Sequence, residues 1–115
     1  MFIKFDGIVI LSAVRTPIGK FGRTLRDLKA SELGSIAIRE AISRADIDPE
    51  DIGLIAMGNV IRAGGGMLTS KQAAILAGLP PTIDCMNIDM VCSSGMASIA
   101  TAALYLDKGA AKIAI

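Results

Sequence analysis

Hydrophobic positions along this chain alternate between short continuous runs and stretches with helical spacing. Continuous runs rich in β-branched residues are typical of strands covered on both faces, whereas a repeat at i, i+3, i+4 and i+7 is typical of a helix. The run GIVILSAV at 7–14 therefore predicts a strand covered on both faces. Further strands are expected at 52–57, at 82–91 and from 112 onward.

Three helices are expected between these runs. The first, at 31–45, has a wide apolar stripe and is expected to be buried over much of its girth. The second, at 69–77, begins with Thr69-Ser70-Lys71-Gln72, a capping-box pattern, and the third, at 93–107, is rich in alanine and serine. The order βαβαβαβ and right-handed crossovers predict an α/β fold with a mainly parallel sheet flanked by helices.

The final run starts a strand that has no continuation. Residues 1–115 are therefore expected to be one incomplete domain, with no second domain in this chain. The stretch 15–28, with Pro17, Gly19 and Gly22, predicts a long irregular loop, and its four basic residues are expected to be solvated. Gly64-Gly65-Gly66 lacks the lysine of a P-loop and predicts only a flexible connection.

Composition excludes several classes of function. The net charge of +1 and the scarcity of aromatic residues disfavour nucleic-acid binding. The absence of histidine removes the commonest metal ligand and the commonest general base. No metal site is expected, and proton transfer near pH 7 needs another group or another polypeptide.

Neither apolar segment that resembles a membrane signal is interpreted as one. Asp6 precedes the first run, and Arg15-Thr16-Pro17 follows it where a signal peptide has small residues for cleavage. The uncharged stretch 90–106 contains hydroxyl residues and Gly95, which favours a buried helix over a membrane span. Cys85 and Cys92 form no C-x-x-C pair, and two thiols without a secretion signal indicate a reduced, cytoplasmic protein.

Cys92 stands between a predicted strand and a predicted helix and precedes Ser93-Ser94-Gly95. Free N–H groups and the macrodipole at a helix N-terminus favour a thiolate and can receive a developing oxyanion. These features suggest a covalent nucleophile for acyl transfer, but a buried cysteine filling the start of a helix fits the spacing at least as well. Cys85 lies seven residues upstream, too far along a straight strand to cooperate, and is interpreted as a core thiol.

Four segments in collinear order resemble the N-terminal part of the thiolase family. They are SAVRTPIGKFG at 12–22, MGNV at 57–60, KQAAILAGLP at 71–80 and NIDMVCSSGMASI at 87–99. The last is similar to the family signature around the acyl-accepting cysteine. The resemblance thus implies that Cys92 is the nucleophile and that its backbone N–H belongs to an oxyanion hole.

The resemblance also implies a reaction and an assembly. Thiolases condense two acetyl-CoA molecules into acetoacetyl-CoA, or catalyse the reverse cleavage, through an acyl-cysteine intermediate. Coenzyme A thioesters are the substrates, no cofactor is permanently bound and no metal is required. Members are dimers or tetramers with two similar α/β halves, and the strand before the nucleophile, here about 83–90, lies near the dimer contact. The sequence does not identify residues that bind coenzyme A.

The chain also departs from the family pattern. The histidine of a Gly-His-Pro motif, the asparagine of an Asn-Glu-Ala-Phe motif and the second cysteine that thiolases carry in later sequence are missing. Cys92 alone should therefore not complete a condensation, and a truncated thiolase or one piece of a split enzyme is expected. The alternatives are a non-catalytic assembly fragment that pairs through an exposed sheet edge, and a decarboxylating ketoacyl synthase, which Met90-Val91-Cys92 fits less well.

Overall fold

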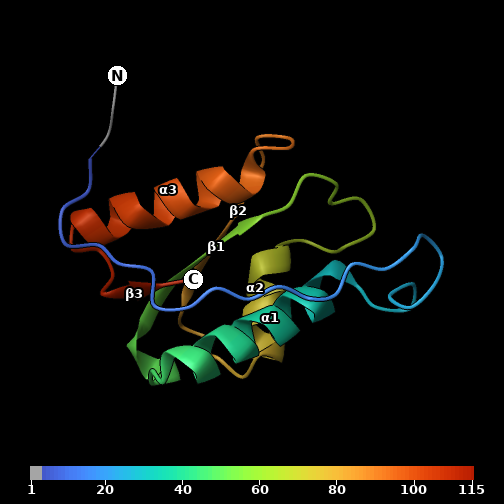
Figure 1. The fold of residues 1–115 in the computed structure, drawn as a ribbon, viewed down its shortest axis with the longest axis horizontal. Coiled ribbons are helices and arrows are strands. Elements are labelled where there is room, and N and C mark those ends of the chain that lie inside the picture. Colours follow the sequence, from blue (N-terminus) through green and yellow to red (C-terminus); the bar gives the residue numbers. More distant parts are fainter. Residues whose placement is uncertain (1–3) are drawn as a thin grey trace.

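A parallel sheet forms the centre of the computed structural model, which describes residues 4–115 (Figure 1). Within these residues the elements follow in the order α1 (Ala30–Ala45), a 3₁₀ turn (Pro49–Asp51), β1 (Ile52–Gly58), α2 (Thr69–Leu76), β2 (Asp84–Ile88), α3 (Ser94–Asp107) and β3 (Ile113–Ala114). The strand order is β2-β1-β3, and β1 runs parallel to both neighbours. α3 covers one face of the sheet, and α1 and α2 cover the other (Figure 1). The predicted α/β class is confirmed.

The core lies where β1 meets α1 and α2. β1 is the central strand, and Leu54 and Ile55, which point to opposite faces, are each 1% exposed. Burial on both faces explains why its sequence is a continuous apolar run. On the side of α2, Ala73 and Ala74 are fully buried, and their small side chains allow close packing. At Gly34 in α1, a Cβ atom would lie 2.8 Å from Cε of Met57 and 3.1 Å from the Cβ of Ala73, so a side chain there would displace these neighbours.

The helix α1 has the predicted bounds within one residue but less burial than predicted. Its buried residues are Ser31, Ser35 and Ile38, and Ile36 remains 42% exposed. The prediction of burial over much of the girth is wrong because α2 and β1 cover only one stripe of the helix. Its amino end is capped by Glu32, whose Oε2 accepts the N–H of Lys29 at 2.6 Å.

The prediction of a strand at 7–14 is also wrong. This segment is extended but belongs to none of the strands assigned within residues 4–115, and Val9 and Ile10 are 71% and 79% exposed. It runs beside α1, where the hydroxyl of Ser12 donates to the carbonyl of Ala41 at 2.8 Å (Figure 1). Both edges of β1 are already paired, and in the described part of the chain the run makes no backbone hydrogen bond to the outer edge of β2 or β3.

The uncharged stretch 90–106 falls mainly in α3, which has 14 residues. Among the residues described, no helix combines the length and apolar character that crossing a membrane requires. α3 instead packs on the sheet through its buried residues Ser94, Ser98 and Ala103. Met96 and Ile99 of the same helix remain exposed.

Candidate active site

The carboxyl ends of β1 and β2 meet the amino end of α3 at one edge of the sheet. The N–H of Asn59, just after β1, donates to the carbonyl of Ile88 at the end of β2 at 3.0 Å. At Gly58 a Cβ atom would lie 2.9 Å from the carbonyl carbon of Ser94, so only glycine allows α3 to start this close to β1. In open α/β sheets, ligands bind at this carboxyl edge.

Cys92 lies on the short connection from β2 to α3, and it is exposed. The predicted position at a strand-to-helix junction is confirmed, with α3 beginning at Ser94. The predicted alternative of a buried cysteine that fills the start of the helix is therefore wrong. Its role as a nucleophile stays a prediction.

The residue before Cys92 has an unusual backbone conformation. Val91 has φ +50°, in the left-handed region, which costs about 1–3 kcal/mol for a residue of this kind. The N–H of Val91 donates to Oδ1 of Asp89 at 3.0 Å, and its carbonyl accepts the hydroxyl of Ser94 at 2.7 Å. Ser94 Oγ also accepts the N–H of Met90 at 2.9 Å. These three hydrogen bonds hold a sharp turn that delivers Cys92 to the surface.

Two backbone N–H groups that follow Cys92 already donate hydrogen bonds within the turn. Those of Ser93 and Ser94 donate to the carbonyls of Met90 and Val91 at 3.0 and 3.2 Å. Within residues 4–115, no hydrogen bond uses the N–H of Cys92. A hydrogen-bond partner for this N–H must therefore come from water, a ligand or protein outside the described residues.

A buried polar layer joins α2 to the carboxyl ends of the two strands. The amide of Asn59 donates to Oγ1 of Thr69 at 2.7 Å, and Oδ1 of Asn87 accepts the N–H of Ser70 at 3.0 Å. In the described part of the chain, Oγ of Ser70 and Nδ2 of Asn87 are buried without a partner.

The predicted capping box at the start of α2 is wrong. Leu68 is the N-cap, Thr69 is buried against Asn59, and Gln72 donates to the carbonyl of Gly65 at 2.9 Å. Thr69 is already the first residue of the helix, so it does not stand at the N-cap position, and these side chains instead tie the helix to the preceding loop. Such long-range partners leave no short-range pattern in the sequence.

Cys85 lies on β2 and packs against the hydrophobic core. Burial raises the pKa of its thiol above the ordinary value, the nearby charge of Lys71 opposes this shift, and that of Asp84 adds to it. A thiol with a raised pKa is a poor nucleophile at neutral pH. The interpretation of Cys85 as a core thiol agrees with this placement.

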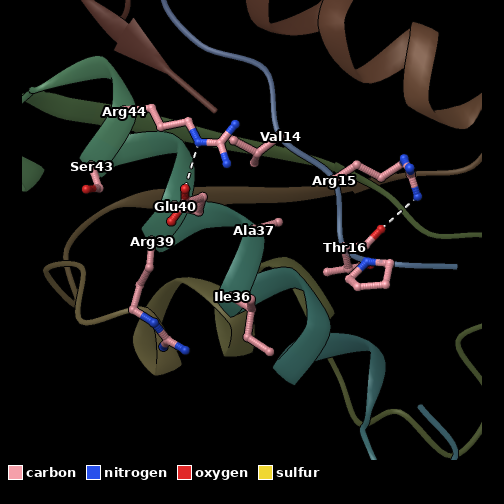
Figure 2. A pocket seen from close by; sticks show the side chains of 10 residues that line it. Val14, Arg15, Thr16, Ile36, Ala37, Arg39, Glu40, Ser43 and Arg44 are labelled. Atoms are coloured by element: carbon pink, nitrogen blue, oxygen red, sulfur yellow. Dashed lines mark hydrogen bonds and ion pairs between the residues drawn. The ribbon is translucent and has the colours of Figure 1, made fainter. Parts of the chain in front are cut away.

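A shallow hollow lies elsewhere, between residues 14–17 and α1 (Figure 2). Its guanidinium groups have partners within this chain: Arg15 donates to the carbonyl of Thr16, and Arg44 pairs with Glu40 at 2.7 Å. The hollow does not include Cys92. No group of three potential metal ligands occurs in the part of the chain that the structure describes.

Sequence reasoning found Cys92 but missed the groups that support it. Asp89, two residues before Val91, fits the side-chain-to-backbone turn that aspartate commonly forms, so this signal was present in the sequence. The contributions of Ser94 and Asn87 depend on the approach of separate elements and carry no such signal.

Comparison with known proteins places this site in context. The family model described as the N-terminal domain of thiolase matches residues 8–115. An acetyl-CoA acetyltransferase of Cupriavidus necator is 43% identical over 108 residues, which make up 94% of this chain and 28% of the relative. A mitochondrial acetyl-CoA acetyltransferase of Danio rerio is 47% identical over 103 residues, 90% of this chain and 24% of the relative.

Solved structures give the same result. A thiolase from Ascaris suum in complex with coenzyme A superposes with a TM-score of 0.86 at 39% identity, covering 89% of this chain and 27% of that chain. The acetyl-CoA acetyltransferase of Bacillus anthracis gives 0.85 at 35% identity, covering 90% of this chain and 26% of that chain. This chain therefore spans about a quarter of the length of these relatives. The family match over residues 8–115 shows that the chain belongs to the thiolase family, and it matches the N-terminal quarter of its relatives.

Proposed function

We propose that this chain carries the acyl-accepting nucleophile, Cys92, of an acetyl-CoA acetyltransferase. The enzyme condenses two acetyl-CoA molecules into acetoacetyl-CoA or catalyses the reverse thiolytic cleavage. The observation that carries the proposal is the exposed Cys92 at the amino end of α3, in a chain of the thiolase family. The coenzyme A bound to the relative from Ascaris suum supports coenzyme A thioesters as substrates.

The first half of the reaction uses groups of this chain. The thiolate sulfur of Cys92 attacks the carbonyl carbon of acetyl-CoA, and the carbonyl oxygen becomes an oxyanion. The unused N–H of Cys92 donates to that oxyanion, which stabilises the charge as it develops. Collapse of the intermediate breaks the carbon–sulfur bond to coenzyme A, which leaves as a thiolate, and acetyl-Cys92 remains.

Both halves also require groups outside this chain. Before the first half, a base must accept the thiol proton of Cys92, and in the second half another must remove a proton from the α-carbon of the second acetyl-CoA. The resulting carbanion attacks acetyl-Cys92, which forms acetoacetyl-CoA and frees the thiolate. This chain contains no histidine, so we assign both bases to the remaining three quarters of a thiolase, continuous with this chain or on a complementing one.

Variants of the two cysteines test this function in the complete natural protein. We expect Cys92→Ser to lower the rate of acetoacetyl-CoA thiolysis at least about a thousandfold, because a hydroxyl replaces the attacking thiolate. Cys85→Ala is the matched control, since Cys85 packs in the core, and should retain the rate within a few fold. Full activity of Cys92→Ser would disprove the proposal.

A specific observation favours a second role. β2 is an edge strand, and the extended segment 7–14 exposes Ile10 without pairing to the strands described. A non-catalytic chain that assembles with a complementary thiolase piece would need such edges. The mass in solution tests this role, because a stable monomer argues against obligate assembly. For the enzyme itself we propose a dimer or tetramer. We keep a reduced, cytoplasmic location as part of the proposal, supported by the free thiols of Cys85 and Cys92.

A further inference from the structure

We propose that Asp89 and Ser94 are positioning residues for acyl transfer, acting through the backbone of Val91. This inference rests on the proposed function, because it takes Cys92 as the nucleophile. The N–H of Val91 donates to Asp89 and its carbonyl accepts the hydroxyl of Ser94, so these two bonds fix the peptide groups on both sides of Val91, whose φ is +50°. That residue sets the direction in which the chain continues to Cys92.

Ser94 connects this turn to the body of the fold. The residue is 5% exposed, and its backbone lies against Gly58 at the end of β1. Its carbonyl accepts the hydroxyl of Ser98 at 2.9 Å, one turn further along α3. The hydroxyl of Ser94 therefore holds the turn in a fixed position relative to β1 and α3.

Asp89 plays a different part because it is exposed. An exposed hydrogen bond contributes little to global stability, so its loss should leave the fold intact. Without this bond, Val91 should leave the left-handed region more often, because that conformation is strained for a β-branched residue. The sulfur of Cys92 would then spend less time where it can attack a bound thioester.

The amide in Asp89→Asn keeps an oxygen that can accept the same hydrogen bond, whereas Asp89→Ala removes it. Val91→Gly removes the need for support, because glycine adopts positive φ without strain. The side chains of Asp89 and Ser94 act on the position of Cys92 and do not bind the substrate. Their loss should therefore lower the maximal rate of acylation and leave the half-saturating concentration of acetyl-CoA unchanged.

The test is the single-turnover rate of Cys92 acetylation by acetyl-CoA in the complete natural protein. We expect Asp89→Ala to slow it about tenfold, Ser94→Ala to slow it at least as much, and Asp89→Asn to stay within about threefold. In the Val91→Gly background, Asp89→Ala should slow acetylation by less than about threefold. Alkylation of Cys92 by iodoacetamide should stay within about twofold in every variant, which reports an intact, exposed thiol.

Two results would overturn the inference while leaving the proposed function standing. One is acetylation of the Asp89→Ala variant at the rate of the protein without substitutions. The other is an equal loss in Asp89→Asn and Asp89→Ala, which would assign the effect to charge. If the protein without substitutions is not acetylated at Cys92 at all, the proposed function fails and the inference fails with it.

Discussion

The two cysteines show how position decides chemistry at the scale of a residue. Cys85 lies on β2 and Cys92 on the connection from β2 to α3. Cys85 is partly buried against the core, whereas Cys92 is exposed. Sequence reasoning separated them correctly in location, because a strand interior and a strand-to-helix junction can be distinguished from flanking residues. The raised pKa of the Cys85 thiol adds a difference in reactivity.

This difference predicts an order of alkylation. A raised pKa means that less of the Cys85 thiol is ionised at any pH below that value, and the thiolate is the reactive form. At pH 7–8, iodoacetamide should therefore modify Cys92 well before Cys85, and modification of Cys85 should accelerate only as the pH rises into the alkaline range. Peptide mass spectrometry after timed quenching measures both rates. Faster alkylation of Cys85 than of Cys92 at pH 7 would contradict this assignment.

At the scale of elements, the polar layer between α2 and the strands accounts for the arrangement of the site. Asn87 accepts the N–H of Ser70, so a strand side chain satisfies the amino end of a helix. Asn59 and Thr69 form a second link between the same layers. Together these bonds hold α2 at the carboxyl edge of the sheet.

Two substitutions in this layer should have opposite outcomes. Asn87→Ala leaves the N–H of Ser70 without its acceptor, which should lower the free energy of unfolding by about 1–3 kcal/mol. Ser70→Ala removes a buried hydroxyl that has no partner among the described residues, so stability should change little or rise. Urea denaturation followed by circular dichroism measures both. A larger loss for Ser70→Ala than for Asn87→Ala would show that the hydrogen-bond assignment is wrong.

Much of the element pattern was predictable, and the failures have a common cause. The bounds of α1, β1, α2 and α3 follow from periodicity, because each of these elements buries at least one face within the described chain. The apolar run at 7–14 predicts a strand but lacks a backbone partner in residues 4–115. The pattern Thr69 to Gln72 predicts a cap but meets tertiary partners instead. Patterns within one segment report its own tendency, whereas pairing depends on what lies beside it.

At the scale of the whole molecule, several apolar side chains remain uncovered. Ile10 lies on the extended segment, Phe21 on the loop at 15–28, and Met96 and Ile99 on α3, and each is at least 65% exposed. Contiguous apolar surface, rather than single exposed residues, marks contacts with other protein, and Met96 and Ile99 are neighbours at i, i+3 on the helix. This observation agrees with a chain that covers about a quarter of the length of its relatives.

The most direct measurement of the central claim is the location of the acetyl group after the complete natural protein reacts with acetyl-CoA. The sample is quenched in acid, digested and analysed by peptide mass spectrometry, with Cys92→Ala and Cys85→Ala treated in parallel. We predict one acetylated cysteine, Cys92, with the label lost in Cys92→Ala and retained in Cys85→Ala. A folded, active enzyme that carries its acetyl group elsewhere, or carries none, would contradict the account.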